Sequence, residues 1–510
     1  MEINSVRVRF APSPTGPLHI GGVRTALYNY LFARKHNGSF ILRIEDTDQT
    51  RFVPGAEEYI IEALTWCGIN FDEGVHVGGP YASYRQSERK EIYHRYAKQL
   101  VNDGFAYYAF DTVDEIEALR KQTEKAKEKP FQYDVHTRKS LKNSLVLDRK
   151  TIQELLDSHA PYAIRLRIPE NEIIELNDLI RGHVAVDSNL LDDKVLYKSD
   201  GMPTYHLANV VDDFLMQITH VIRGEEWLPS APMHVLLYRY LGIEDKMPQF
   251  VHLPLLLKPD GKGKLSKRDG DRLGFPVFPL QWKDPKTGEI SSGYRESGFY
   301  PEAFVNMLAL LGWNPGTTQE CFSLEELVEN FSFDRVSKSG SKFDADKARW
   351  FNQQYLRIRS FEELAEQLKS WLQQRGINLG LDKLLRVIPL VADRVSFVHE
   401  LWDQAWFFFF RPESYDSALI KKRWTSDTSE HLLWVSKLLA TAPDFTYEGL
   451  SALVKEQIDE RGLHFGSIML PLRIVLVGSS VGPDLFVIMQ HLGREETLSR
   501  IEIAIEKIKY

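Results

Sequence analysis

Two kinds of hydrophobic periodicity alternate near the amino terminus, and this alternation limits the fold more than any other feature of the chain. Val6, Val8 and Phe10 recur at every second residue, as in a β-strand. A loop rich in proline and glycine follows. Residues 23–31 then carry apolar side chains at helical spacing, before a second apolar run at 40–44. A strand, a crossover helix and a strand form a parallel pair. The sequence therefore predicts an α/β fold built on a parallel sheet.

The length and the later periodicity indicate several domains. A chain of 510 residues is too long for one hydrophobic core. An apolar stretch that resumes near residue 196 predicts the second half of the same sheet, so we expect a Rossmann-like domain that an insertion splits. Helical spacing dominates after about residue 340, as at Phe361, Leu364 and Leu368. The expected parts are 1–90 with 200–255 for the Rossmann-like domain, 91–199 for the insertion, 256–340 for a third domain, and 341–510 for an all-helical C-terminal region with room for two subdomains.

The composition excludes several classes of protein. Lys and Arg number 63 and Asp and Glu 71, and this net charge of −8 excludes a uniformly basic surface but not a local basic face. Residues 341–510 are nearly neutral, with 22 basic and 23 acidic side chains, so this region repels a polyanion less. The two cysteines, Cys67 and Cys321, exclude a disulfide framework and a multi-cysteine zinc site. No run of about 18 apolar residues predicts a membrane span, and we expect a cytoplasmic protein that does not bind membranes.

The loop at 11–22 lies between the first strand and the first helix. Such a junction directs free backbone N–H groups and the positive end of a helix dipole at the adjacent cleft. Gly21 and Gly22 let a ligand approach the backbone closely, and His19 adds a side-chain donor. A tight turn with an incidental histidine explains the spacing equally well.

A second glycine-flanked loop carries two lysines. Lys264 and Lys267 stand three residues apart between Gly263 and Gly270, so both can reach one polyphosphate. Taken alone, this loop is better explained as a solvated basic loop.

Together the two loops resemble the "HIGH" and "KMSKS" signatures of class I aminoacyl-tRNA synthetases. Gly22 stands at the fourth position of the first signature, where the wider class has histidine. More narrowly, five segments resemble bacterial-type glutamyl-tRNA synthetases: 9–21, 44–48, 84–89, 203–213 and 221–227. The resemblance implies ATP-dependent ligation of L-glutamate to tRNA(Glu) through a glutamyl-adenylate, with release of AMP and pyrophosphate. It also implies Mg²⁺ with the ATP, an acceptor-binding insertion, a stem-contact domain at 256–340, an anticodon-binding C-terminal region, and a monomer.

The resemblance assigns roles to individual residues. Glutamate carries two carboxylates and one ammonium. Arg9 and Arg223 match the carboxylates, and Glu45 matches the ammonium. The catalytic residues implied are His19, Lys264 and Lys267. Those implied for ATP are Ser13, Thr15, His19, Gly21, Gly22, Glu226, Trp227, Leu265, Ser266 and Lys267. Those implied for glutamate are Arg9, Ala11, Ser13, Glu45, Tyr205, Asn209, Arg223 and Trp227.

Two metal hypotheses are disfavoured. The acidic cluster at 45–48 follows a strand, and consecutive strand residues point to opposite faces, so they cannot all converge on one divalent ion. Some members of the family bind zinc in the insertion, but 107–111 contains no cysteine here. Neither cysteine has a partner at ligand spacing, and we expect no zinc.

The C-terminal region offers candidate contacts to RNA. Arg394 and Arg473 match the expected place of arginines that contact the tRNA anticodon, although ordinary helix-surface charges explain each of them equally well. The aromatic run at 406–410 predicts a buried helical segment rather than a platform for base stacking, because five consecutive rings cannot face one ligand.

Two other functions compete with charging of tRNA(Glu). Glutaminyl-tRNA synthetases differ at 12–16 and carry β-barrels where this chain predicts helices. A small-molecule nucleotidyltransferase would use similar phosphate contacts but is usually much shorter and needs no helical tail. The sequence does not decide whether tRNA(Gln) is also charged.

Overall fold

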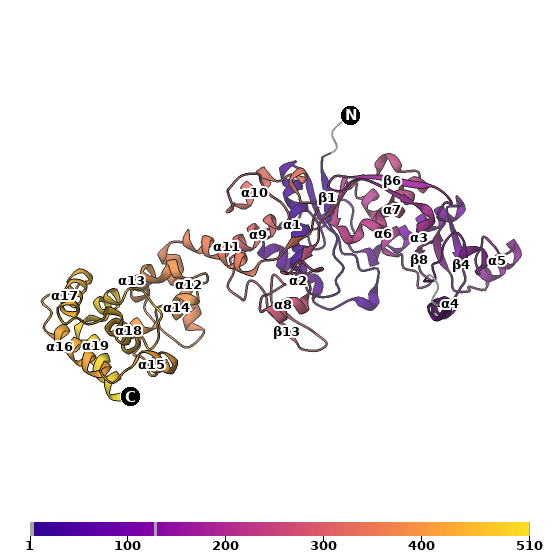
Figure 1. The fold of residues 1–510 in the computed structure, drawn as a ribbon. Helices are drawn as coiled ribbons and strands as arrows, with labels where there is room; N and C mark the ends of the chain where they lie inside the picture. Colours follow the sequence, from indigo (N-terminus) through magenta and orange to yellow (C-terminus); the bar gives the residue numbers. More distant parts are fainter. Residues whose placement is uncertain (1–4, 127–129, 509–510) are drawn as a thin grey trace. The chain divides into compact units, whose positions relative to one another are not determined.

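The computed structural model describes residues 5–126 and 130–508, apart from the side chains of Ala126, Lys267 and Asp271. The chain forms two compact units, Met1–Ala348 and Arg349–Tyr510. The first holds the β-strands and the second is helical (Figure 1). The predicted fold class, a parallel-sheet α/β domain followed by an all-helical region, is confirmed.

A seven-stranded sheet organises the first unit. Its pairings are parallel except for the antiparallel pair β6 and β7. The chain leaves β1 towards β2 on one side and returns to the other side of β1 at β9, which makes β1 the point where the strand order reverses. In such sheets a crevice opens at the carboxyl ends of the strands on either side of that point. In spatial order the strands are β3 (Glu73–Gly74), β2 (Ser39–Leu42), β1 (Arg7–Phe10), β9 (His220–Gly224), β10 (Gln249–Leu253), β6 (Ile173–Asp178) and β7 (Gly182–Asp187).

Helix α1 (Ile20–Lys35) joins β1 to β2 and packs on β1. Its fully buried apolar side chains include Val23, Leu27 and Leu31, whose spacing explains why this segment is helical. The other α-helices of the first unit are α2 (Ala56–Trp66), α3 (Lys90–Asn102), α4 (Val113–Ala126), α5 (Arg149–Asp157), α6 (Tyr205–Leu215), α7 (Ala231–Tyr240), α8 (Lys267–Leu273), α9 (Pro301–Leu310) and α10 (Leu324–Asn330).

The segment 91–199 is only partly separate from the main sheet. It contains an antiparallel sheet of β4 (Ala106–Ala109), β5 (Ala163–Leu166) and β8 (Val195–Tyr197), with a small core around Tyr107 and Tyr133. Strands β6 and β7, however, extend the main sheet, because β6 pairs with β10 at Phe250 and Asp178. The boundaries expected from the sequence placed both strands in the insertion. The buried alternate residues of β6, Ile174 and Leu176, cover the core that α7 also contacts.

The glycine-flanked lysine loop lies between β11 (Leu256–Leu257) and α8. It is a short hairpin, in which Lys258 and Leu265 donate backbone hydrogen bonds to Gly263 and Leu256. Three further short strands complete the first unit: β12 (Trp282–Lys283), β13 (Ile290–Ser291) and β14 (Ser341–Lys342).

A large apolar core gathers buried residues between Phe407 and Ile508 in the second unit. The structure corrects the prediction that 406–410 is a buried helical segment. Residues 406–408 form a 3-10 helix, in which Phe407 is fully buried, whereas Phe410 is 46% exposed.

Among the described residues, no helix has the length and hydropathy of a membrane span. Helix α11 (Ala345–Arg357) contains the boundary between the units, and the later helices are α12 (Phe361–Gln373), α13 (Leu381–Val391), α14 (Glu400–Asp403), α15 (Ser417–Arg423), α16 (Thr428–Ala440), α17 (Tyr447–Glu460), α18 (Phe465–Val477) and α19 (Leu485–Lys507).

Gly38 lies in the turn from α1 into β2, where we expect even a small substitution to have a severe effect. A Cβ atom at Gly38 would lie 2.1 Å from the carbonyl oxygen of Val6, and this backbone cannot move without disturbing the pairing of β1 and β2. We expect Gly38→Ala to lower the free energy of unfolding by about 2 kcal/mol. Gly21→Ala is the control, because its Cβ would meet nothing closer than 3.4 Å. Urea unfolding, followed by hydrogen exchange in peptides from α1 and β2, measures both changes. Equal stability of the two variants would contradict the packing described here.

Candidate active site

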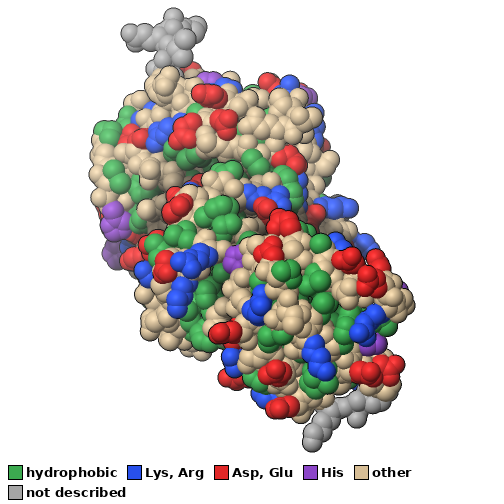
Figure 2. Space-filling model, turned by 90° about the vertical axis from the view of Figure 1, so that its left-hand side faces the viewer, with side chains coloured by type: hydrophobic (Ala, Val, Ile, Leu, Met, Phe, Trp, Pro, Cys, Tyr) green, Lys and Arg blue, Asp and Glu red, His purple; other side chains and the backbone are tan. Residues whose placement is uncertain are grey.

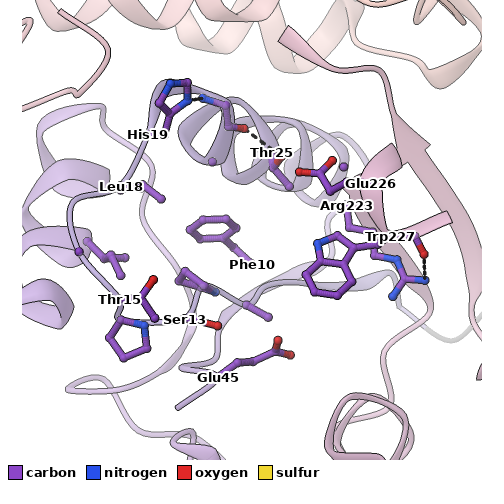
Figure 3. Close-up of a pocket in the computed structure, with 18 of the residues that line it drawn as sticks. Phe10, Ser13, Thr15, Leu18, His19, Thr25, Glu45, Arg223, Glu226 and Trp227 are labelled. Atoms are coloured by element: carbon purple, nitrogen blue, oxygen red, sulfur yellow. Dashed lines mark hydrogen bonds between the residues drawn. The ribbon is translucent and has the colours of Figure 1, made fainter. Parts of the chain in front are cut away.

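A cavity of about 1100 Å³ opens where β1 and β9 end. The loop after β1, the start of α1, the segment after β9 and the lysine loop all contribute to its wall (Figure 3). His19 and Lys264, which are 245 positions apart in the sequence, therefore line one cavity. The two loops that the sequence analysis singled out lie together in space.

His19 caps the first helix and presents one nitrogen for a ligand. Its Nδ1 accepts the backbone N–H of Gly21 at 3.1 Å, so the imidazole proton is on Nε2. That buried Nε2 has no hydrogen-bond partner among the described residues. Burial, together with the nearby Lys264, lowers the pKa of His19 to about 4. The imidazole is therefore neutral near pH 7 and offers an N–H donor.

The lysine loop contacts the segment after β9 through one ion pair. Lys264 Nζ lies 2.7 Å from Glu226 Oε1, and both side chains are substantially exposed. Leu265 lines the cavity, whereas Ser266 does not. Ser266 is instead the N-cap of α8 and forms a capping box with Asp269, in which its hydroxyl oxygen accepts the backbone N–H of Asp269 and the Asp269 carboxylate accepts the backbone N–H of Ser266. The side chain of Lys267 lies outside the described part of the structure.

A buried cluster of charges forms the floor of the cavity. Arg9 donates from Nε and Nη2 to the two oxygens of Asp213, at 3.0 and 3.2 Å. Arg43 donates to the same carboxylate at 2.7 Å and to Glu45 at 3.1 Å. Each of these four side chains is at most 8% exposed, so water screens their charges little. Asn209 adds a hydrogen bond to Oε1 of Glu45 at 3.2 Å.

The shifted pKa values show how this cluster is balanced. Burial opposes ionisation of Asp213, but Arg9 and Arg43 hold its pKa below the usual range. Burial alone would lower the pKa of Arg43, and Asp213, Glu45 and Asp212 raise it instead. Burial raises the pKa of Glu45, although Arg43, Arg9 and the hydrogen bond from Asn209 oppose this shift. A cation bound at Glu45 would lower that pKa again.

Arg223 lies on the opposite wall of the cavity, near the end of β9 (Figure 3). It donates from Nη1 to the Tyr205 hydroxyl at 2.8 Å and from Nε to His252 at 3.0 Å. The Tyr205 ring packs against Trp227, with 4.2 Å between ring centroids. Two guanidinium groups, from Arg9 and Arg223, thus face one cavity that also contains a carboxylate.

The cavity brings together most of the residues singled out from the sequence. Those of the predicted set that line it are Arg9, Ala11, Ser13, Thr15, His19, Gly21, Gly22, Glu45, Tyr205, Asn209, Arg223, Glu226, Trp227, Lys264 and Leu265. Arg43 and Asp213, which complete the buried cluster, are not among the predicted site residues. Arg43 is the only charge between Phe40 and Ile44, and this lone charge in an apolar run was the available signal.

The two candidate RNA-contacting arginines belong to the second unit. Arg473 donates to the backbone oxygen of Val481 at 3.0 Å, while Arg394 is exposed. Burial lowers the pKa of Arg473, while Asp484 opposes this shift and Arg394 adds to it.

No group of three or more His, Cys, Asp and Glu side chains within 5–126 and 130–508 is arranged to hold a metal ion.

Known proteins similar to this chain were found at three levels. A family model described as "tRNA synthetases class I (E and Q), catalytic domain" matches residues 5–350, and one described as "Anticodon binding domain" matches 363–505. Glutamate–tRNA ligases of Porphyromonas gingivalis and Phocaeicola vulgatus are 58% and 57% identical, over 98% and 100% of both chains respectively. A crystal structure of a glutamate tRNA ligase from Elizabethkingia meningosepticum in complex with its amino acid is 50% identical, covers 99% of this chain and 100% of that one, and has a TM-score of 0.91.

The buried cluster predicts a large effect for Asp213→Asn. The amide cannot neutralise Arg9 and Arg43, so we expect the free energy of unfolding to fall by about 3 kcal/mol or more. The control is Glu62→Gln in an exposed pair with Arg295, where about 1 kcal/mol or less is expected. Urea unfolding at pH 7, read by hydrogen exchange in β1 and β2, checks both values.

The difference in free energy of unfolding between wild type and Asp213→Asn should depend on pH. An ionised Asp213 stabilises the fold above its unfolded pKa of about 3.9, and this contribution is lost as the pH falls through the lower folded pKa. The free energies of unfolding of wild type and Asp213→Asn should therefore converge in acid. A difference that grew in acid would contradict an ionised Asp213 in the folded protein.

Proposed function

The chain belongs to the class I aminoacyl-tRNA synthetases for glutamate and glutamine, and we propose that it joins L-glutamate to tRNA(Glu) through a glutamyl-adenylate formed from ATP. Full-length identity to glutamate–tRNA ligases supports aminoacylation of tRNA(Glu). The observation that carries the finer proposal is the single cavity shared by His19, Lys264, Arg9, Arg223 and Glu45.

The proposed reaction has two steps. An oxygen of the glutamate α-carboxylate attacks the α-phosphorus of ATP, and the bond to the bridging oxygen breaks to release pyrophosphate. A ribose hydroxyl at the tRNA terminus then attacks the activated carbonyl carbon, loses its proton, and displaces AMP. Both steps need alignment and cationic groups near the leaving phosphate more than a strong base.

His19 is suited to the α-phosphate or ribose end of ATP. Its cap to Gly21 fixes the ring and its tautomer, and the buried Nε2–H is left for an oxygen acceptor. Because its pKa is about 4, this donor stays neutral at physiological pH. Ser13, Thr15, Gly21 and Gly22 line the same cavity.

Lys264 and Lys267 would contact the outer phosphates. Lys264 now pairs with Glu226, so it would exchange this carboxylate for a phosphate when ATP binds. Mg²⁺ that accompanies ATP would be held largely by phosphate oxygens and water.

The glutamate site would use the groups that the buried cluster leaves available. Asp213 occupies Nε and Nη2 of Arg9, which leaves Nη1 for a carboxylate. Oε1 of Glu45 accepts two hydrogen bonds, while its Oε2 accepts none from the described residues and can meet the ammonium. Arg223 would hold the other carboxylate of glutamate. A fixed cation at that position favours a carboxylate side chain over the neutral amide of glutamine.

The tRNA would extend over both units. We assign the acceptor end to the insertion at 91–199, the stem to 256–340, and the anticodon to the C-terminal region with Arg394 and Arg473. Basic and acidic side chains are interspersed on the face shown in Figure 2, so this face offers RNA local basic groups rather than a uniformly basic surface. A monomer in the cytoplasm stays a prediction.

Purified enzyme tests this function directly. We expect charging of tRNA(Glu) with glutamate, and ATP–pyrophosphate exchange that requires tRNA. A small-molecule nucleotidyltransferase would exchange without RNA, and a glutaminyl-tRNA synthetase would prefer glutamine and tRNA(Gln). Assays with both amino acids and both tRNAs separate these outcomes, and either of the last two would overturn the proposal.

Arg223→Gln tests the amino-acid site separately. Loss of a charge-assisted pair with a carboxylate should raise the glutamate KM by roughly 10- to 100-fold and leave the ATP KM nearly unchanged. Arg295→Gln removes an equally charged but 41% exposed side chain outside the cavity and should leave both constants near wild type. An unchanged glutamate KM in Arg223→Gln would remove this residue from the site.

A further inference from the structure

Arg223 is anchored by a chain of buried groups that does not reach the cavity. His252 on β10 lies next to Arg223 in the parallel pairing of β10 with β9. Its Nε2 lies 3.0 Å from Arg223 Nε, and its Nδ1 lies 2.7 Å from Asp178 Oδ2. His252 is fully buried and Asp178 is 4% exposed, and neither lines the cavity. The Nε edge of Arg223 therefore faces away from the ligand, and its outer nitrogens face towards it.

The chemistry of these groups fixes the proton positions. An arginine Nε can only donate a hydrogen bond, so Nε2 of His252 must accept. The proton of a neutral imidazole is then on Nδ1, where it is donated to Asp178. Oδ2 of Asp178 also accepts the backbone N–H of His252, and Oδ1 accepts those of Ile180 and Arg181. The carboxylate is thereby held in one orientation and remains ionised.

We propose that His252, oriented by Asp178, is a positioning residue that holds the guanidinium of Arg223 in the geometry that binds the glutamate carboxylate. This inference rests on the proposed function, because it assumes that Arg223 contacts glutamate. It gives the inserted strand β6 a part in amino-acid recognition, through Asp178 at its end. His252 itself touches no substrate and is not a catalytic residue.

The charged surroundings of His252 give the anchor a pH dependence. The groups that face it are Asp178 from β6, Arg181 from the turn after β6, and Arg223 from β9, while His234 on α7 contacts Arg223 from the other side at 3.4 Å. Burial and Arg223 lower the pKa of His252, although Asp178 opposes this shift. Protonation would place an N–H at Nε2, directly against the N–H of Arg223. The anchor should therefore hold near pH 7 and fail in acid, below the ordinary histidine pKa of about 6.5.

Two substitutions at position 252 separate the hydrogen bond from the packing. His252→Phe keeps a ring beside Phe250 but removes both nitrogens, so Arg223 loses its acceptor. We expect the glutamate KM to rise about 10-fold or more, with the ATP KM within about twofold of wild type. His252→Gln can offer an amide oxygen to Arg223, and its glutamate KM should stay within about fivefold of wild type. Equal glutamate constants for wild type and the phenylalanine variant would overturn the proposal.

The pH profile provides a readout that a purely structural role would not change. Between about pH 8 and pH 5.5 the glutamate KM of wild type should rise in acid, and this rise should be smaller in His252→Gln, which cannot be protonated. Burial lowers the pKa of His206 to about 4 and that of His234 well below its ordinary value, and both residues are present in both proteins, so the difference between the profiles reports His252. A profile of His252→Gln that matches wild type would contradict the proposal.

A direct readout of the proton position does not depend on the phenylalanine variant. In two-bond ¹⁵N–¹H spectra of histidine-labelled enzyme, the ring whose signals disappear in His252→Gln should be neutral and protonated at Nδ1. If the ring that disappears is protonated at Nε2, the proposal is overturned. Failure of the proposed function looks different, because wild type would then not charge tRNA(Glu) at all, whereas failure of this inference leaves charging intact and the glutamate KM insensitive to His252.

Discussion

One buried carboxylate, that of Asp213, allows two arginines to lie beneath the cavity. Arg9 on β1 and Arg43 after β2 both donate to it, and all three side chains are at most 3% exposed. Two unpaired guanidinium groups could not be buried there, because the cost of removing their charge from water is several kcal/mol each. Helix α6, which carries Asp213, must therefore pack under the ends of β1 and β2 for the cavity to exist. The same pairing decides which edge of Arg9 remains available to a ligand.

The second guanidinium is supported differently. Among the residues that the structure describes, no carboxylate pairs directly with Arg223, and Asp178 reaches it only through His252, whereas Asp213 accepts two hydrogen bonds from Arg9. The charge of Arg223 is therefore less compensated than that of Arg9 and stays available to a glutamate carboxylate. One of the two inserted strands that extend the main sheet, β6, thereby contributes to the site. Without β6 there would be no acid behind β10.

The sequence predicted the parts of this site that local pattern determines and missed those that depend on register. The period of two at Val6, Val8 and Phe10 and the helical spacing after it specify β1 and α1, and the motif loops were recognised from their residues. Asp178 and His252, however, are 74 positions apart and meet only through the single pairing of β6 with β10. Arg43 resembled an ordinary strand charge until its burial was known. Ser266 matched a ligand motif, but its hydroxyl is used to cap α8.

The pairing of Lys264 with Glu226 shows how the proposed phosphate contact can form at little cost. Both side chains are more than 40% exposed, and pairs of this kind contribute about 1 kcal/mol or less. The phosphates of ATP carry several negative charges, so they compete effectively with one carboxylate for the same ammonium. Glu226 can therefore keep the lysine loop near the cavity before ATP arrives without preventing its transfer. His19 changes little in this exchange, because its neutral state follows mainly from burial and only secondarily from Lys264.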